Sequence, residues 1–201
     1  CAERDKLSRI FVVAPFSNII DQTVKILRKA VVLEGENPEE IVVAHHHRAE
    51  FSSKDMRKYS ASWNAPIVVT TAVQFFETLS EANPSRLRKL HNVVGSCVFI
   101  DESHACLPVE LLNISWNWIK QFTDTWNCQF VFSSGSMVKF WEDNYLISEG
   151  FRELPDLFPD SLVDPIKKSE KQRVSVKRVE DPLSLNQILD YIQSREIWNA
   201  Y

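Results

Sequence analysis

Short apolar runs alternate with segments in which apolar residues recur at helical spacing. Five of the runs have the length and composition of strands that are buried on both faces of a sheet. They are residues 10–14, 41–44, 67–69, 97–100 and 130–132. Each run is short enough for a strand, and turn-forming residues such as Pro15 and the Gly35–Pro38 segment separate the patterns.

Three segments between these runs carry the apolar spacing of helices. The first follows residue 14, the second follows Thr70 and Thr71, either of which can cap it, and the third begins with Pro108. Their apolar positions are Ile20, Val24, Leu27 and Val31; Val73, Phe76 and Leu79; and Leu111, Leu112, Ile119 and Phe122. A polar stretch, residues 48–64, lies between the second and third apolar runs.

This alternation predicts right-handed βαβ units and therefore a mainly parallel sheet with helices on both faces. The carboxyl ends of the strands in such a sheet all lie along one edge, where ligands bind. Four polar motifs follow predicted strands and should converge at this edge. They are Pro15-Phe16-Ser17, Thr70-Thr71, Asp101-Glu102-Ser103-His104 and Ser134-Gly135-Ser136.

The tetrapeptide Asp101-Glu102-Ser103-His104 points to nucleotide hydrolysis. In enzymes that hydrolyse nucleoside triphosphates, a strand-end carboxylate holds the Mg²⁺ that bridges the phosphates, and a neighbouring polar group orients the attacking water. We therefore expect Asp101 to hold the metal and Glu102 to position the water. The tetrapeptide alone also fits a solvated loop after a strand, with Ser103 and His104 as ordinary turn residues.

Composition describes an ordinary soluble chain, with 44% apolar and 25% charged residues among 201. Its net charge of −4 argues against a free-standing basic nucleic-acid-binding module, although an acidic protein can still carry a local basic groove. Four cysteines without a C-x-x-C pair fit a reducing cytoplasm, and no apolar run suggests a membrane partner. Because the sequence starts at Cys1, we expect a piece of a longer protein.

The order of the strand-end motifs resembles that of superfamily 2 helicases, in particular the first RecA-like domain of a DExH motor. More narrowly, residues 13–23 and 69–79 resemble the CRISPR-associated helicase-nuclease of type I systems, and residues 83–92 resemble the segment before its acidic motif. The matches cover residues 9–140, and Thr-Thr-x-x-Gln-Phe-Phe is the most specific of them. The resemblance implies a RecA-like three-layer domain, truncated at its amino end.

The family resemblance implies an ATP-dependent translocase that pulls on single-stranded DNA after recruitment to a CRISPR surveillance complex, in antiviral interference. It implies Mg²⁺ and ATP at Asp101 and Glu102, with His104 relaying the nucleotide state. By the same resemblance, Ser134 and Ser136 couple hydrolysis to strand movement. The positions expected along the DNA strand are Pro15, Thr70, Thr71 and Gln74.

The sequence differs from the family pattern in motifs that the activity of the family requires. The coupling motif reads Ser-Gly-Ser where Ser-Ala-Thr is usual. None of the four glycines belongs to a Gly-Lys-Ser/Thr phosphate loop, and no His-Asp dipeptide of the family's nuclease domain occurs. The arginine motif of a second RecA-like domain is also missing. We therefore expect the parent protein to be an ATP hydrolase, and these 201 residues alone to neither hydrolyse ATP efficiently nor cut DNA.

Two domains are expected. Residues 1–145 would form the first RecA-like domain without its phosphate-loop segment, and residues 146–201 would lead toward a second, as a linker strand and helix. Val174, Val176 and Val179 suggest the strand. Residues 184–187 have the pattern of a capping box that opens a helix.

Other patterns have weaker meanings. The His45-His46-His47 run invites a metal site, but neighbouring side chains on a strand alternate faces, so at most His45 and His47 could share an ion. The basic cluster of Arg86, Arg88, Lys89 and His91 fits either DNA phosphates or a solvated helix face. The alternatives to a CRISPR translocase are a non-catalytic helicase-like module that binds a partner or nucleic acid, and another DExH helicase.

Overall fold

A computed structural model describes residues 7–46, 49, 51–80, 87–148, 154–173 and 183–193. The chain divides into two compact units, Cys1–Glu153 and Leu154–Tyr201. The predicted edge strand at residues 174–179 lies outside the described residues, as does the predicted His47 position.

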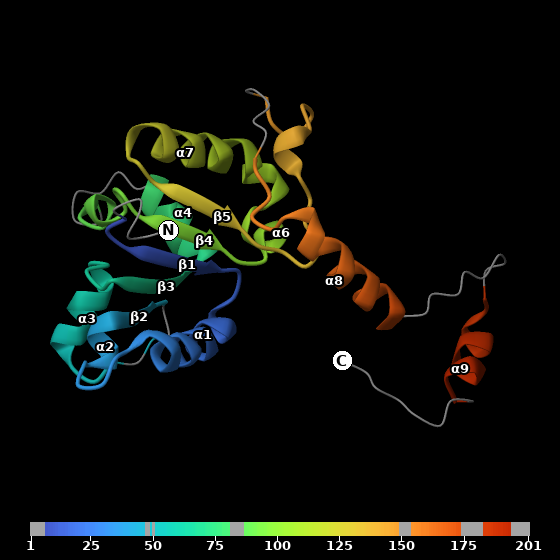
Figure 1. Ribbon diagram of the computed structural model, residues 1–201, viewed down its shortest axis with the longest axis horizontal. Coiled ribbons are helices and arrows are strands. Elements are labelled where there is room, and N and C mark those ends of the chain that lie inside the picture. The colour runs from blue at the N-terminus through green and yellow to red at the C-terminus, as the bar shows by residue number, and fades with distance from the viewer. Residues whose placement is uncertain are drawn as a thin grey trace. The chain divides into compact units, whose positions relative to one another are not determined.

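The first unit contains one five-stranded sheet in which every neighbouring pair of strands is parallel (Figure 1). The strand order is β2-β3-β1-β4-β5. All five predicted strands are confirmed within two residues at their ends. Their bounds are Ile10–Ala14 for β1, Val42–His45 for β2, Ile67–Thr71 for β3, Cys97–Ile100 for β4 and Gln129–Phe132 for β5.

Helices connect the strands, and short single-turn segments occur in the connections and after β5. The longer ones are α1 (Ser17–Val31), α3 (Lys54–Ala61), α4 (Ala72–Ser80) and α7 (Leu112–Thr125). The short ones are α2 (Pro38–Ile41), α6 (Ser103–Cys106) and the 3₁₀ turns η1 (Leu90–Asn92), η2 (Val109–Leu111) and η3 (Phe140–Glu142).

The direction of each crossover places its helix on one face of the sheet. The β1-to-β2 connection runs toward the β2 edge, whereas the later connections run back toward β5. Since parallel crossovers are right-handed, α1 covers one face and α3, α4 and α7 cover the other. The result is the three-layer α/β arrangement of a RecA-like domain, as the sequence predicted.

Each face of the sheet has its own core. On the α1 face, a cluster joins Ile20 and Val24 to strand residues Ala14, Val42 and Val69. On the opposite face, Phe11 of β1 contacts Trp63 and Phe75, with ring centroids 5.2 and 6.0 Å away. All three of these rings are fully buried. Burial of such aromatic side chains is a main source of the domain's stability.

Two helical segments differ in detail from the prediction. The polar stretch of residues 48–64 contains α3, which starts at the cap Ser53 and is mostly exposed, so it needs few apolar residues. In α4 the buried face includes Phe75 rather than Val73, which is 61% exposed. Helical spacing could not choose between these positions because the apolar residues of α4 form one broad face, with Val73 at one margin and Phe75 at the other.

The second unit contains α8 (Asp160–Arg173) and α9 (Leu185–Gln193). The predicted capping box is confirmed: the Ser184 backbone N–H donates to Gln187 Oε1 at 2.9 Å, and the Gln187 N–H donates to Ser184 Oγ at 3.4 Å. Of the helices that the structure describes, none has the length and apolar character that crossing a membrane requires.

Candidate functional site

The acidic motif sits at the carboxyl end of β4, in the interior of the sheet. Its backbone is tied to the strands on both sides. The Asp101 N–H donates to the Val13 carbonyl and the Ser103 N–H donates to the Ser133 carbonyl, both at 2.9 Å. These bonds fix the tetrapeptide between the ends of β1 and β5, as the convergence of strand ends predicts.

Glu102 adopts a left-handed backbone conformation, with φ 46° and ψ 53°. This conformation is uncommon for a residue with a side chain, and it costs free energy that the surrounding hydrogen bonds must offset. The Glu102 N–H donates to Asp101 Oδ1 at 3.0 Å. The Glu102 carboxylate lies beside His104 instead, so the two carboxylates of the motif have different partners.

Glu102, His104 and Ser134 form a polar cluster that joins the β4 and β5 strand ends. His104 Nδ1 lies 2.7 Å from Ser134 Oγ and 3.3 Å from Glu102 Oε2. The Ser134 hydroxyl donates to Glu102 Oε2 at 3.5 Å, and it accepts from the Ser136 N–H at 3.2 Å. The structure therefore brings Glu102 and His104, which were predicted to serve hydrolysis, into contact with Ser134, which was predicted to serve coupling.

This cluster contributes little to the stability of the fold. The Glu102 and His104 side chains are 44% and 42% exposed, and ion pairs at such exposure contribute little to stability. A ligand that attracts the Glu102 carboxylate, or a shift of the β5 loop, can change the contacts at small cost. A motion of Ser134 is thus linked directly to the position of a carboxylate.

Cys106 lies beneath the motif and is not a nucleophile in this setting. Its thiol is buried and donates to the Asp101 carbonyl at 3.0 Å. Burial, followed by the nearby charges of Asp101 and Glu102, raises the pKa of Cys106 to about 12. The group remains a protonated thiol that supports the backbone of the motif.

The other residues that were predicted to lie at the carboxyl edge of the sheet have different surroundings in the structure. Pro15 directly follows β1 and is partly exposed. Thr71 Oγ1 accepts from the Gln74 N–H at 3.2 Å and so caps α4, while the Gln74 side chain is partly exposed. Thr70 is fully buried, and its hydroxyl donates to the His45 carbonyl at 2.8 Å.

His45 is held neutral beside Lys89. Its ring packs edge-to-face on Trp63 at 5.7 Å, and its Nε2 lies 3.5 Å from Lys89 Nζ. Burial, followed by the charges of Lys89 and His46, lowers the pKa of His45 to about 3. His45 therefore stays uncharged at every physiological pH.

His46 points to the other face of the sheet, where its Nε2 lies 3.3 Å from Asp21 Oδ1 on α1. The two described histidines of the run thus face apart, as strand alternation predicts. Among the described residues, no group of three or more His, Cys, Asp or Glu side chains is arranged to hold a metal ion.

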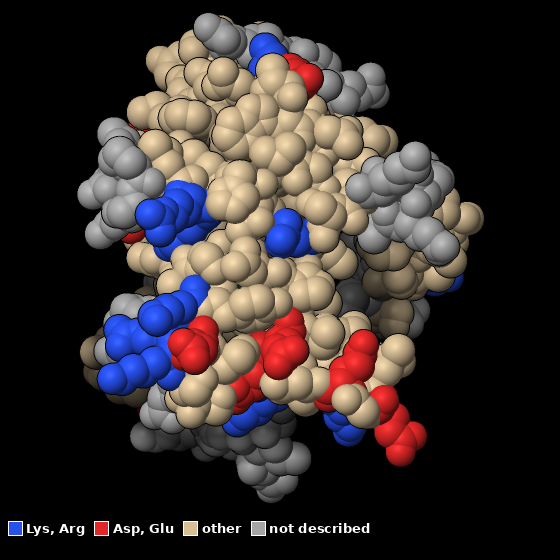
Figure 2. All heavy atoms as spheres, turned by 90° about the vertical axis from the view of Figure 1, so that its left-hand side faces the viewer, with Lys and Arg blue, Asp and Glu red and all other residues tan. Residues whose placement is uncertain are grey.

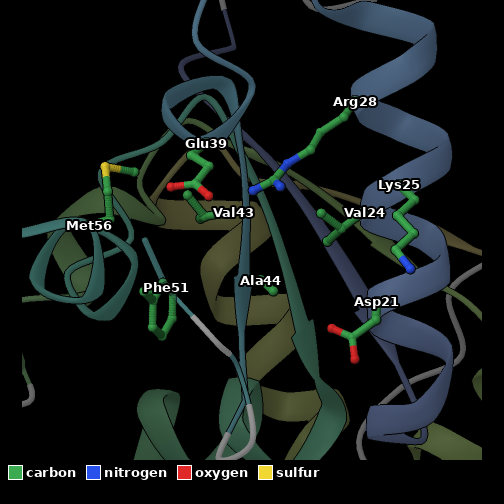
Figure 3. A pocket seen from close by; sticks show the side chains of 9 residues that line it. All are labelled: Asp21, Val24, Lys25, Arg28, Glu39, Val43, Ala44, Phe51 and Met56. Atoms are coloured by element: carbon green, nitrogen blue, oxygen red, sulfur yellow. The ribbon is translucent and has the colours of Figure 1, made fainter. Parts of the chain in front are cut away.

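A separate small cavity of about 120 Å³ lies beside β2, between α1 and the α2 and α3 segments (Figure 3). Charged side chains of both signs line it, among them Asp21, Lys25 and Glu39, together with the apolar Phe51 and Met56. The Arg28 guanidinium crosses it to the Val42 carbonyl, with Nη2 at 2.9 Å. None of the predicted site residues lines this cavity, and its mixed charge selects no ligand class.

The fold and the site place the chain among three-layer α/β proteins with an acidic and hydroxyl cluster at the carboxyl edge of a parallel sheet. No protein-family model matches the sequence, and no match was found among curated proteins.

The sequence pattern did not predict the burial of Trp63 or the position of Lys89 over its ring. Trp63 lies in a polar stretch, yet it is fully buried with φ 60°, and Lys89 Nζ lies 5.1 Å from its ring centroid. The isolated tryptophan in a polar segment was the available signal, since so large an apolar side chain seeks burial.

Proposed function

We propose that this chain is part of an ATP-dependent single-strand DNA translocase of the DExH class, acting in CRISPR interference. The observation that carries the proposal is the contact of Glu102 with both His104 and Ser134 across the β4 and β5 strand ends. A motor needs such a link between the hydrolytic carboxylate and a loop that can move. The assignment to CRISPR interference rests on the sequence resemblance of residues 13–23 and 69–79.

Asp101 is the residue proposed to hold Mg²⁺ for the substrate ATP. Mg²⁺ is bound through one or two carboxylates together with substrate phosphates and water, so a single strand-end carboxylate fits the ion. The ion would neutralise charge on the phosphates when bound. Glu102 orients the attacking water and accepts its proton, while His104 and Ser134 report the position of Glu102 to the β5 loop.

Single-stranded DNA is proposed to lie along the carboxyl edge. Gln74 is partly exposed and offers a side-chain amide, which can donate to phosphates without reading bases. Pro15 has no backbone N–H and offers its ring for van der Waals contact, and Thr71 caps the helix that carries Gln74. The buried hydroxyl of Thr70 acts indirectly, because its bond to the His45 carbonyl fixes β3 against β2. A CRISPR surveillance complex and further segments of the same polypeptide are the proposed protein partners.

One sequence feature favours a second candidate function. The 201 residues contain no Gly-Lys-Ser/Thr phosphate loop, so residues outside them must supply it before ATP can be hydrolysed. If no such loop is supplied, the same fold can act as a non-catalytic module that binds nucleic acid or a partner protein.

A Mg²⁺ titration of DNA-stimulated ATP hydrolysis tests the proposal in the intact polypeptide that carries this sequence. Asp101→Asn should raise the Mg²⁺ concentration for half-maximal rate by about tenfold or more, because it removes a direct ligand. The control Asp164→Asn, on exposed α8, should leave the titration unchanged. An unchanged titration in Asp101→Asn would contradict the assignment. DNA binding without hydrolysis at any Mg²⁺ concentration would support the non-catalytic module.

A further inference from the structure

The basic residues of the 87–91 segment do not form an isolated helix face. Arg88 and Lys89 line an open hollow of about 540 Å³ together with Lys58, which comes from α3. Figure 2 shows groups of Lys and Arg side chains on the face of the molecule that carries α3, beside a group of acidic side chains. Asp55 is the one acidic residue among the described residues that line the hollow, so this described lining carries net positive charge.

The two walls of this hollow are fixed relative to each other. Asn92 is buried, and its amide donates to the Ser62 carbonyl at 2.8 Å and to Asn64 Oδ1 at 2.9 Å. These bonds tie the segment that carries Arg88 and Lys89 to the segment that follows α3. A buried amide with two acceptors is a strong local constraint, because breaking either bond would leave a polar group unsatisfied.

Lys89 is positioned by the core rather than by solvent. Its ammonium lies over the Trp63 ring, and Trp63 itself packs against Phe11 and Phe75. A cation held against an aromatic face keeps its charge and loses conformational freedom, so it can contact an anion at low entropic cost. Lys58 and Arg88 also line the hollow, and both side chains are exposed.

We infer that this hollow binds the phosphate backbone of single-stranded nucleic acid, at a surface separate from the carboxyl edge of the sheet. Ser62 and Asn64 precede β3 and Lys89 precedes β4, so the hollow is built from segments that lead into the strands. Cations with a neighbouring aromatic ring, here Tyr59, are the groups that single strands contact irrespective of sequence. The choice of nucleic acid rests on the proposed function, whereas the attraction for a polyanion rests on the hollow itself.

Fluorescence anisotropy of a labelled oligothymidylate, measured without nucleotide at several salt concentrations, tests this inference. The test variants are Lys58→Glu, Arg88→Glu and their combination, and the matched control is Lys29→Glu at an exposed position of α1. The double variant should weaken binding by about tenfold or more at low salt, and each reversal should reduce the salt slope by about one. Lys29→Glu should change affinity by less than about twofold, since it alters only the net charge.

Asp55→Asn tests the same site in the opposite direction. Removing this carboxylate, which lies 3.8 Å from Lys58 Nζ, should tighten binding. Matching thermal melts by circular dichroism establish that the exposed substitutions leave the fold intact. A double variant that binds like Lys29→Glu would overturn the inference. Displacement of the oligonucleotide by polyglutamate at equal negative charge would also overturn it, since the site would then accept acidic protein segments. Because no ATP is present, these results are independent of the role of Glu102.

Discussion

At the scale of single residues, the sequence predicted which polar residues lie at the strand ends. It did not predict the contacts that their side chains make. Asp101 and Ser134 follow apolar runs, so their convergence follows from parallel topology alone. The left-handed turn at Glu102 and its contact with His104 depend on hydrogen bonds from β1 and β5, which no local pattern encodes. Thr70 and Thr71 are adjacent, yet one is buried in the sheet and the other caps α4.

His45 gives a pH prediction at this scale. Its pKa is about 3 in the folded chain and 6.5 ordinarily, so between these values the unfolded chain binds a proton that the folded chain does not. Stability contributed by neutral His45 is therefore complete above pH 6.5 and is lost as the pH falls toward 3. The slope from this group is at most about 1.4 kcal/mol per pH unit.

Urea denaturation at a series of pH values measures this effect. His45→Gln should show a shallower loss of unfolding free energy below pH 6.5 than the wild-type chain. His91→Gln, at an exposed position, should follow the wild-type curve. Equal slopes for His45→Gln and the wild-type chain would show that burial does not keep His45 neutral.

At the scale of elements, the strands and the α9 capping box were predictable because apolar runs and cap residues are local signals. The polar helix α3 was not, because its exposed surface leaves no apolar periodicity to read. The contribution of α3 to the fold becomes clear from its hydrogen bond to the edge of the sheet. β2 is at the end of the strand order, and its Val42 and Ala44 carbonyls accept bonds from Arg28 of α1 and Ser60 of α3.

These two carbonyls lie two residues apart and so point to the same side of an edge strand, which would otherwise be open to pairing with another chain. Ser60→Ala removes a buried 2.6 Å bond and should lower the unfolding free energy by about 1–3 kcal/mol. Adding Arg28→Met should also promote self-association, measured by sedimentation velocity. Ser80→Ala, which removes an exposed hydroxyl, should change stability by no more than about 0.5 kcal/mol. A monomeric, fully stable double variant would contradict this role for the edge.

At the scale of the whole molecule, topology explains why motifs from distant parts of the sequence lie at one edge of the sheet. Residues near positions 15, 71, 101 and 134 meet because four parallel strands end at one edge. The phosphate loop expected of the proposed motor is not encoded in these 201 residues, so in the proposed function the acidic motif supplies carboxylates and not the phosphate cradle.

The central claim is that Glu102 is the hydrolytic carboxylate of a DNA-driven motor. Its most direct test is the rate of ATP hydrolysis with single-stranded DNA by the intact polypeptide, compared with Glu102→Gln and with the exposed control Glu110→Gln. Loss of the group that orients water and accepts its proton should lower kcat by about 100-fold or more in Glu102→Gln, and Glu110→Gln should match the wild type. If Glu102→Gln hydrolyses ATP within about twofold of the wild-type rate, Glu102 is not the general base, because loss of a general base lowers the rate far more.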